Sequence, residues 1–441
     1  MSNSSSRRRS PNRRGREPAP VKIELTVERL GAGGDGVGQW RGAPVYAPGL
    51  LAGERAAVQL GAKRGDGRQA AVVALLDAAA ERIEPPCPYA ADCGGCTVQH
   101  LADEPYILWK ESLLDQPLAS RGLIPEIRRP MLRIADGRRR IRLAAIGRAD
   151  GAVIGLNAKA SKQIVDLDRC MAATEGVADA PALLRPLMDR ILKSGEAADI
   201  EVRAAKAGLD VLIVRKRPFD MAEREAIASF AAASGLARLA WRPDDRDSPE
   251  VVAERASPAI DLGGLTVTPP PGAFFQPTAA GEAAMADFAA RHLAGVDRVA
   301  DLYCGWGAFA LRLAGPMHVE AFESDAAMVA ALNRAASPEG KGVFVQGIVR
   351  DLARQPLMAA DLKRFGGLIL DPPRGGAAFQ VEHLAIAGPA KVVYLSCNPA
   401  SLARDARMLV DGGYRFVEAQ PIDQFRWTPH LEVACYFERA A

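Results

Sequence analysis

The chain contains 49% hydrophobic and 25% charged residues, which is an ordinary globular composition. Its length of 441 residues is enough for two or three domains. No apolar run approaches the roughly 20 residues of a membrane span, and the Ser- and Arg-rich start lacks an apolar secretion segment. We therefore expect a cytoplasmic protein, with a monomer as the default.

The net charge of +3 is unevenly distributed along the chain. Residues 1–20 hold six Arg and one Glu, so this stretch carries +5 and the remainder about −2, the difference between +3 and +5. The composition predicts a disordered basic tail that is available to phosphate backbones or is merely solvated.

Residues 21–80 are predicted to form a small β-barrel, because short alternating strands at 22–27, 31–38 and 43–47 are split by glycines. These glycines lack the preceding strand and following helix of a dinucleotide fingerprint, which we exclude. Lys63, Arg64 and Arg68 are candidates for contact with RNA phosphates, or else form a solvated rim.

Three of the seven cysteines, Cys87, Cys93 and Cys96, fall in a Gly-rich run, and Cys170 is the natural fourth ligand of a metal centre. We favour a 4Fe-4S cluster that supports structure or RNA binding rather than redox chemistry. Zinc held by four thiolates, or no metal at all, are the alternatives. Disulfides are not expected in a cytosolic chain.

Residues 81–265 are predicted to form an α+β domain. Its expected elements are a helix at 100–118, a hairpin of 138–147 with 151–156, strands at 200–202 and 209–214, and a helix at 220–234. Its densest basic group comprises Arg138, Arg139, Arg140 and Arg142. Alternation places Arg140 and Arg142 on one face of a strand, which we interpret as an RNA-facing strip, with a solvated hairpin as the alternative.

Residues 266–441 alternate strand and helix from Gly295 onward, which predicts a doubly wound parallel sheet. A first strand at 298–303 is followed by a glycine turn at 304–307 and a helix at 308–314. Glu323 ends the second strand, where a carboxylate can accept ribose hydroxyls. The turn is too short for a pyrophosphate cradle, which favours S-adenosylmethionine over a dinucleotide.

Three further residues are expected at strand ends in this domain. Asp371 ends the fourth strand in an Asp-Pro-Pro run followed by Arg374, and the lack of an aromatic residue there favours a carbon target over an amine. Cys397 follows a strand at 392–395 and precedes a helix, whose N-terminus should ease thiol ionisation; a small buried hydrophobe is the alternative. Glu432 is the candidate base, and His430 orients it or, as we favour, packs.

Together these motifs resemble the RNA uracil-5-methyltransferase family over nearly the whole chain from about Val21. The resemblance rests on a TRAM-like start, Cys-x5-Cys-Gly-Gly-Cys, and the runs at 271–276, 301–307, 371–374, 396–399 and 429–432. It implies an α/β protein in which a C-terminal Rossmann-like methyltransferase domain follows an OB-like TRAM barrel and a central α+β iron–sulfur domain. The subgroup with barrel and cluster is associated with 23S rRNA, whereas the tRNA enzymes typically lack both.

The resemblance also implies a site. Gln276, Tyr303, Glu323 and Asp371 should line the S-adenosyl-L-methionine pocket, with Cys397 as nucleophile and Glu432 as base. In that mechanism the Cys397 thiolate adds to C6 of uracil, C5 takes the methyl group, and Glu432 removes the C5 proton. The target base must be unpaired; the aromatic candidates to stack on it, or to pack in the core, are Phe274, Phe275 and Trp306.

Three departures from the family pattern are Ala308, Ile348 and the run at 427–430. A tRNA uridine-5-methyltransferase is the first alternative to an enzyme that acts on 23S rRNA. Two less favoured rivals are an RNA cytosine-5-methyltransferase and a non-catalytic RNA-binding protein. The first usually has a second cysteine beside the fourth-strand acid, and residues 371–376 contain none. The second is disfavoured because Cys397, Asp371 and Glu432 are all present.

Overall fold

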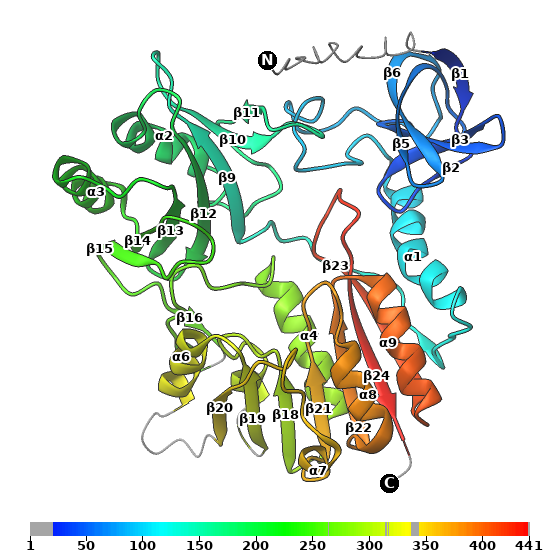
Figure 1. Ribbon diagram of the computed structural model, residues 1–441, viewed down its shortest axis with the longest axis vertical. Coiled ribbons are helices and arrows are strands. Elements are labelled where there is room, and N and C mark those ends of the chain that lie inside the picture. Colours follow the sequence, from blue (N-terminus) through cyan, green and yellow to red (C-terminus); the bar gives the residue numbers. More distant parts are fainter. Residues whose placement is uncertain (1–20, 263, 314, 316, 337–343, 440–441) are drawn as a thin grey trace, which may run out of the picture. The chain divides into compact units, whose positions relative to one another are not determined.

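The computed structural model describes residues 21–262, 264–313, 315, 317–336 and 344–439 (Figure 1). The basic tail predicted at 1–20 lies outside the described residues. The chain divides into two compact units, Met1–Arg82 and Ile83–Ala441. No helix formed by the described residues is both long and apolar enough to cross a membrane.

The first unit is a six-stranded sheet wrapped around a small apolar core that includes Leu25, Val45 and Val58. Its strands, in the spatial order β1-β5-β6-β4-β3-β2, are β1 (Lys22–Thr26), β2 (Arg29–Leu30), β3 (Asp35–Trp40), β4 (Ala43–Pro48), β5 (Arg55–Arg64) and β6 (Gly67–Asp77). A Cβ at Gly38 would lie 2.2 Å from the Thr26 carbonyl oxygen, so only glycine allows this close strand crossing. Residues 31–34 form a turn rather than a strand.

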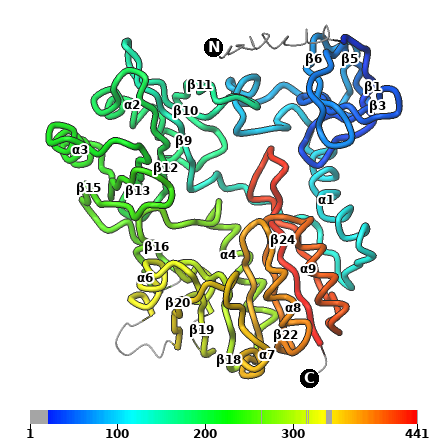
Figure 2. The backbone as a smooth tube through the Cα atoms, viewed as in Figure 1, coloured from blue at the N-terminus to red at the C-terminus, as the bar shows by residue number. Residues whose placement is uncertain are grey.

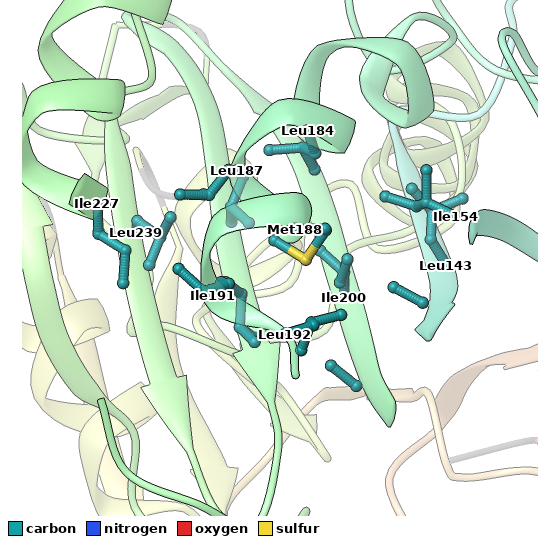
Figure 3. Close-up of a cluster of buried hydrophobic side chains, with 14 of the residues drawn as sticks. Leu143, Ile154, Leu184, Leu187, Met188, Ile191, Leu192, Ile200, Ile227 and Leu239 are labelled. Atoms are coloured by element: carbon teal, nitrogen blue, oxygen red, sulfur yellow. The ribbon is translucent and has the colours of Figure 1, made fainter. Parts of the chain in front are cut away.

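The central part of the second unit is a seven-stranded sheet in the order β11-β10-β9-β12-β13-β14-β15. The strands are β9 (Arg140–Ile146), β10 (Val153–Asn157), β11 (Ile164–Asp166), β12 (Ala197–Ala205), β13 (Gly208–Val214), β14 (Arg238–Arg242) and β15 (Glu250–Glu254). Helices α2 (Ala180–Ile191) and α3 (Met221–Ser234) pack against the sheet, and Figure 3 shows Leu184, Leu187 and Met188 of α2 facing its apolar side chains. Apolar residues on alternate strand positions and one helix stripe therefore share one core.

A second sheet carries the C-terminal half of the chain (Figure 1). Its main order is β20-β19-β18-β21-β22-β24-β23. The strands are β18 (Arg298–Leu302), β19 (His318–Glu323), β20 (Val345–Val349), β21 (Gly367–Leu370), β22 (Lys391–Ser396), β23 (Arg415–Asp423) and β24 (Glu432–Glu438). β18 to β22 are parallel as predicted, whereas β24 runs antiparallel to both β22 and β23.

The helices of this part are α4 (Ala279–His292), α5 (Ala310–Leu313), α6 (Ala326–Ala336), α7 (Ala359–Leu362), α8 (Ala378–Ala387) and α9 (Pro399–Asp411). The helix predicted at 308–314 is thus shorter, within the described residues. The small strands β16 (Ile260–Asp261) and β17 (Thr266–Val267) pair just before α4.

An earlier part of the chain, residues 103–133, also packs on this sheet (Figure 2). Two short strands, β7 (Ile127–Arg128) and β8 (Leu132–Arg133), pair in parallel with β23, and the preceding helix α1 (Asp103–Ala119) packs against α9. Residues 103–133 therefore lie against the C-terminal sheet, although their sequence position placed them in the central domain.

Candidate active site

Four of the predicted site residues meet at the carboxyl edge of the parallel strands. Leu302 pairs with Leu370, and Leu370 pairs with Tyr394, so Tyr303 and Asp371 emerge side by side at this edge. Ser396 pairs with Val433 in the antiparallel neighbour, which puts Cys397 opposite Glu432. Ligands of open α/β sheets bind at this edge.

Cys397 is half-buried and lies within the electrostatic reach of both carboxylates. Burial, together with the charges of Glu432 and Asp371, raises the pKa of the Cys397 thiol to about 11, while Arg374 acts in the opposite direction. The expectation that the N-terminus of α9 would ease ionisation is therefore wrong for the protein alone, because desolvation and two like charges outweigh one helix end.

Two glutamines connect the carboxylates. Gln276 Nε2 donates to Asp371 Oδ2 (3.2 Å), and Gln424 Nε2 donates to Gln276 Oε1 (3.1 Å). The Gln424 side chain also hydrogen-bonds Glu432, and its Oε1 accepts the Thr278 hydroxyl (3.1 Å). Sequence reasoning missed Gln424 as a site residue, although it stands at the head of the run that contains Glu432.

Both carboxyl groups are held in surroundings that disfavour their charged forms. Burial raises the pKa of Asp371 to about 7, despite the hydrogen bond from Gln276. Burial and the nearby Asp371 raise the pKa of Glu432 to about 8, although Gln424 hydrogen-bonds it. A carboxyl group with a pKa near 8 can both accept and release a proton near neutral pH.

The glycine turn lies beside this group. Glu323 Oε2 accepts the Gly305 amide (3.2 Å), and its Oε1 accepts the amides of Ser324 (2.7 Å) and Asp325 (3.0 Å). Tyr303 adopts a left-handed conformation (φ 64°), which is uncommon for a bulky residue and marks a constrained turn. The carboxylate of Glu323 is thus fixed in direction at the end of β19.

Two of the three departures noted in the sequence lie near this turn, and the third, the run at 427–430, lies in the loop before β24. Ala308 packs at the edge of an apolar cluster that includes Trp306 and Leu311, and Ile348 lies inside β20, paired with Phe322. Neither position offers a polar side chain to a ligand.

Of the aromatic candidates, two belong to the core. Phe275 and Trp306 are buried with ring centroids 5.5 Å apart, and Trp306 Nε1 donates to the Phe274 carbonyl (2.7 Å). Phe274 is 53% exposed, and the Arg140 guanidinium lies 4.3 Å from its ring centre. Only Phe274 has a face available for stacking on a base.

The basic group at 138–142 serves several different purposes. Arg139 is buried, pairs with Glu282 and donates to the Gln276 carbonyl (2.9 Å), so it supports the fold. Arg142 pairs with Asp199 (2.8 Å), Glu201 (3.4 Å) and Asp245 (2.9 Å). Its positive charge is therefore already balanced.

Arg140 differs, because it takes part in no ion pair of the described residues and its Nε lacks a hydrogen-bond partner. Burial and the neighbouring Arg203 lower the pKa of Arg140 to about 10. Arg140 and Arg142 both line two cavities, of about 360 and 260 Å³; His430 lines the first and Phe274 the second. The predicted alignment of these arginines on one face is thus confirmed.

His430 packs rather than orienting the candidate base. Its ring lies edge-on to Phe425 with centroids 5.5 Å apart, and burial lowers the pKa of His430. Among the described residues no hydrogen bond joins its ring to Glu432, which agrees with the interpretation that we favoured.

Cys87, Cys93, Cys96 and Cys170 line one cavity together with Arg138. The Gly95 amide donates to Cys93 Sγ (3.4 Å), and burial raises the pKa of Cys93, Cys96 and Cys170. Within the described ranges, no group of three or more His, Cys, Asp or Glu side chains is arranged to hold a single metal ion.

In the first unit, Lys63, Arg64 and Arg68 are all exposed. Arg64 pairs with Asp35 (2.5 Å) and stacks on Tyr46, whereas Arg68 Nε donates only to the neutral Gly61 carbonyl (3.2 Å). The local charge of Arg64 is thus balanced, and only the other two cations resemble a free rim.

A largely parallel sheet with a glycine turn after its first strand, a carboxylate after its second and an acid after its fourth defines a Rossmann-like S-adenosylmethionine-dependent methyltransferase. The fold agrees with a solved structure: the tRNA (uracil-54, C5)-methyltransferase of Pyrococcus abyssi in complex with S-adenosyl-L-homocysteine superposes with a TM-score of 0.73. The match covers 94% of this chain and 99% of that one at 24% identity, which shows the fold.

Sequence comparison identifies the family. An uncharacterized RNA methyltransferase of Rhizobium meliloti is 37% identical over 94% of this chain and 99% of its own length. The 23S rRNA (uracil(1939)-C(5))-methyltransferase RlmD of Aeromonas hydrophila is 32% identical over 95% of this chain and 97% of its own. The tRNA (uracil-5-)-methyltransferase family model matches residues 343–440. The chain belongs to the RNA uracil-5-methyltransferase family and is an S-adenosylmethionine-dependent enzyme that acts on RNA.

Proposed function

We propose that this enzyme methylates C5 of a specific uridine in 23S ribosomal RNA through a covalent bond between Cys397 and C6 of the base. The observation that carries the mechanism is the meeting of the Cys397 thiol with the carboxyl groups of Asp371 and Glu432 at one sheet edge. The 23S target is supported by the 32% identity to the Aeromonas hydrophila enzyme over nearly the full length of both chains.

Uracil C5 is a poor nucleophile, so the ring needs activation before it can accept a methyl group. The Cys397 thiolate forms a bond to C6, and the electron pair released to C5 attacks the methyl group that S-adenosylmethionine supplies. Glu432 then takes the proton from C5, and the electrons of that C–H bond expel the thiolate. The raised pKa of Glu432 makes it a stronger base than an ordinary carboxylate.

We propose that four residues bind S-adenosylmethionine: Gln276, Tyr303, Glu323 and Asp371. Glu323 has its carboxylate fixed at the end of β19, which suits a ribose diol. A cation near a thiol lowers the thiol pKa, so the sulfonium of bound cofactor opposes the effect of the two carboxylates on Cys397.

The four cysteines fit a 4Fe-4S cluster better than a single zinc ion. Their thiols line one cavity, and the Gly95 amide already donates to one sulfur. Zinc sites usually take their cysteines as two closely spaced pairs, whereas here the fourth cysteine stands alone, about seventy residues after the other three. Cys87, Cys93, Cys96 and Cys170 would hold the cluster, which would then crosslink residues 87–96 to Cys170.

We further propose the domain limits 1–20 for the basic tail, 21–80 for a TRAM-like RNA-binding barrel, 81–265 for the iron–sulfur domain and 266–441 for the methyltransferase domain. Within the third range, residues 103–133 pack on the sheet of the methyltransferase domain. The six-stranded sheet of the first unit, with Lys63 and Arg68 exposed, supports an RNA-binding role for the barrel.

One experiment separates the candidate reactions. The protein is incubated with tritiated S-adenosylmethionine and with separate 23S rRNA and tRNA from a strain that lacks it. Label in 5-methyluridine of 23S rRNA is expected; label in tRNA would reject the 23S target, and label only in 5-methylcytidine would reject the uracil reaction. A brown preparation containing iron and sulfide supports the cluster, and a colourless zinc-loaded one refutes it.

A further inference from the structure

The loop that leads into Glu432 contains a strained residue. Trp427 has φ 64°, a left-handed conformation that costs a bulky side chain free energy and persists only where neighbours enforce it. Its carbonyl accepts the amides of both Thr97 (2.7 Å) and Val98 (3.1 Å), and its own amide donates to Tyr106 Oη (3.0 Å). Every backbone polar group of Trp427 is thus bonded to residues 97–106.

A buried ion pair extends the same attachment. Tyr106 Oη donates to Asp423 Oδ2 (2.6 Å), and Lys110 Nζ lies 2.8 Å from Asp423 Oδ1 with both side chains buried. Lys110 also donates to the carbonyls of Thr428 (3.1 Å) and His430. Residues 97–110 therefore bind the loop between β23 and β24 at three residues, and they also bind Asp423 at the end of β23. Glu432 is the first residue after this loop.

The segment that makes these bonds begins directly after the cysteine run. Thr97 follows Cys96, and Arg138, which lines the cysteine cavity, donates to the Arg426 carbonyl (3.4 Å). The cysteine site is thus joined directly, at the Cys96–Thr97 peptide bond, to the amides that bind the Trp427 carbonyl.

We propose that the four-cysteine site is the anchor of the catalytic-base loop: by fixing Cys96 it fixes the Thr97 and Val98 amides, which hold Trp427 in its strained conformation and so position Glu432. This inference rests on the proposed roles of Glu432 and of the cysteines. It gives the metal a purpose that requires no electron transfer. Thr97, Val98 and Trp427 are positioning residues, because they act only through Glu432.

Hydrogen exchange of the amides tests the link without measuring methyl transfer. Metal is removed from the full-length protein with a chelator, and exchange is compared with that of the loaded protein. Exchange of Thr97, Val98 and the segment 424–431 is expected to accelerate at least about tenfold, while β19 stays unchanged. Faster exchange confined to residues 87–96 would overturn the proposal. The Cys397→Ala protein should behave identically, so a wrong nucleophile would not alter this result.

A pair of variants tests the strain in the loaded protein, in case metal removal unfolds the chain. Trp427→Ala and Trp427→Gly both delete the indole ring, but only glycine adopts positive φ without a penalty. The kcat of Trp427→Gly is expected to exceed that of Trp427→Ala at least about threefold, with equal KM for RNA. If the ring matters only through packing, glycine will be equal or worse, and the positioning role of the strained backbone is then rejected.

Discussion

Buried acidic side chains have different partners in the central part of the chain and at the edge of the C-terminal sheet. In the central part, Asp210 accepts two hydrogen bonds from Arg238 (both 2.9 Å), and Glu223 pairs with Arg215 (2.8 Å) and Arg217 (2.7 Å). Burial raises the pKa of Glu223, but the hydrogen bonds from Arg217 and Arg215 prevail and lower it to about 2. Glu223 therefore stays charged, and its ion pairs, like those of Asp210, help to hold the fold together.

At the catalytic edge, Asp371 and Glu432 are bonded by glutamine amides rather than by arginines. Their pKa values of about 7 and 8 follow mainly from burial, because no cation of the described residues forms an ion pair with either carboxyl group, and the charges of Arg140 and Lys110 near Glu432 do not overcome its burial. Paired buried charges thus mark structural positions in this protein, and unpaired ones mark the site where protons move.

The largest expected effect comes from the thiol at the unpaired site. Cys397→Ala should lower methyl transfer at least about a thousandfold, because no covalent adduct can form. Cys435→Ala is the matched control, since Cys435 is a fully buried core thiol on β24, and it should remain within about tenfold of wild type. A Cys397→Ala enzyme with normal turnover would remove the nucleophile from the mechanism.

Glu432→Gln should slow turnover about a hundredfold and let the RNA adduct accumulate on denaturing gels, because C5 keeps its proton. The base acts in its ionised form and the pKa of Glu432 is about 8, so wild-type turnover should rise with pH toward that value. The variant should lose this part of the rise and keep only the part that comes from ionisation of the Cys397 thiol. Glu438→Gln, at the other end of β24, is the control. Unchanged pH dependence in Glu432→Gln would assign the proton to another group.

A smaller effect should separate two arginines of the basic strip. Arg140→Ala is expected to weaken RNA binding about tenfold, because no ion pair of the described residues engages Arg140 and its charge is available to a phosphate. The slope of the logarithm of RNA affinity against the logarithm of salt concentration should also become shallower by about one. Arg142→Ala should weaken binding only about twofold, since three acids already balance Arg142. Binding titrations at several salt concentrations measure both, and equal losses would contradict the distinction.

The smallest effect concerns stability. Glu432 has a folded pKa above its ordinary value, so its ionisation destabilises the fold increasingly as pH rises from about 4.5 to about 8. Glu432→Gln should therefore raise Tm by a few degrees at about pH 9 and hardly at about pH 5. Glu223→Gln should lower Tm, because it removes the nearer acid of the buried Arg215 and leaves only Glu196 at 3.6 Å. If Tm at about pH 9 falls in both variants, Glu432 does not destabilise the fold, and the proposed difference between the two regions is wrong.

Local pattern alone predicted much of this protein. Helices near 103–119 and 221–234 and the strands that end before Tyr303, Asp371 and Cys397 follow from apolar periodicity and from glycine and proline punctuation, which act within a few residues. Motif order pointed to the same edge for the site residues and to the methyltransferase family.

What only the tertiary structure decided is which partner each polar or aromatic side chain meets. Four features join residues that are far apart in the chain. They are the pairing of β7 and β8 with β23, the hydrogen bond from Gln424 to Gln276, the hydrogen bonds to Trp427, and the different partners of Arg139, Arg140 and Arg142. Sequence periodicity encodes which face of an element is buried, but the neighbour that satisfies a buried group depends on how the elements pack, and that neighbour sets its charge and chemistry.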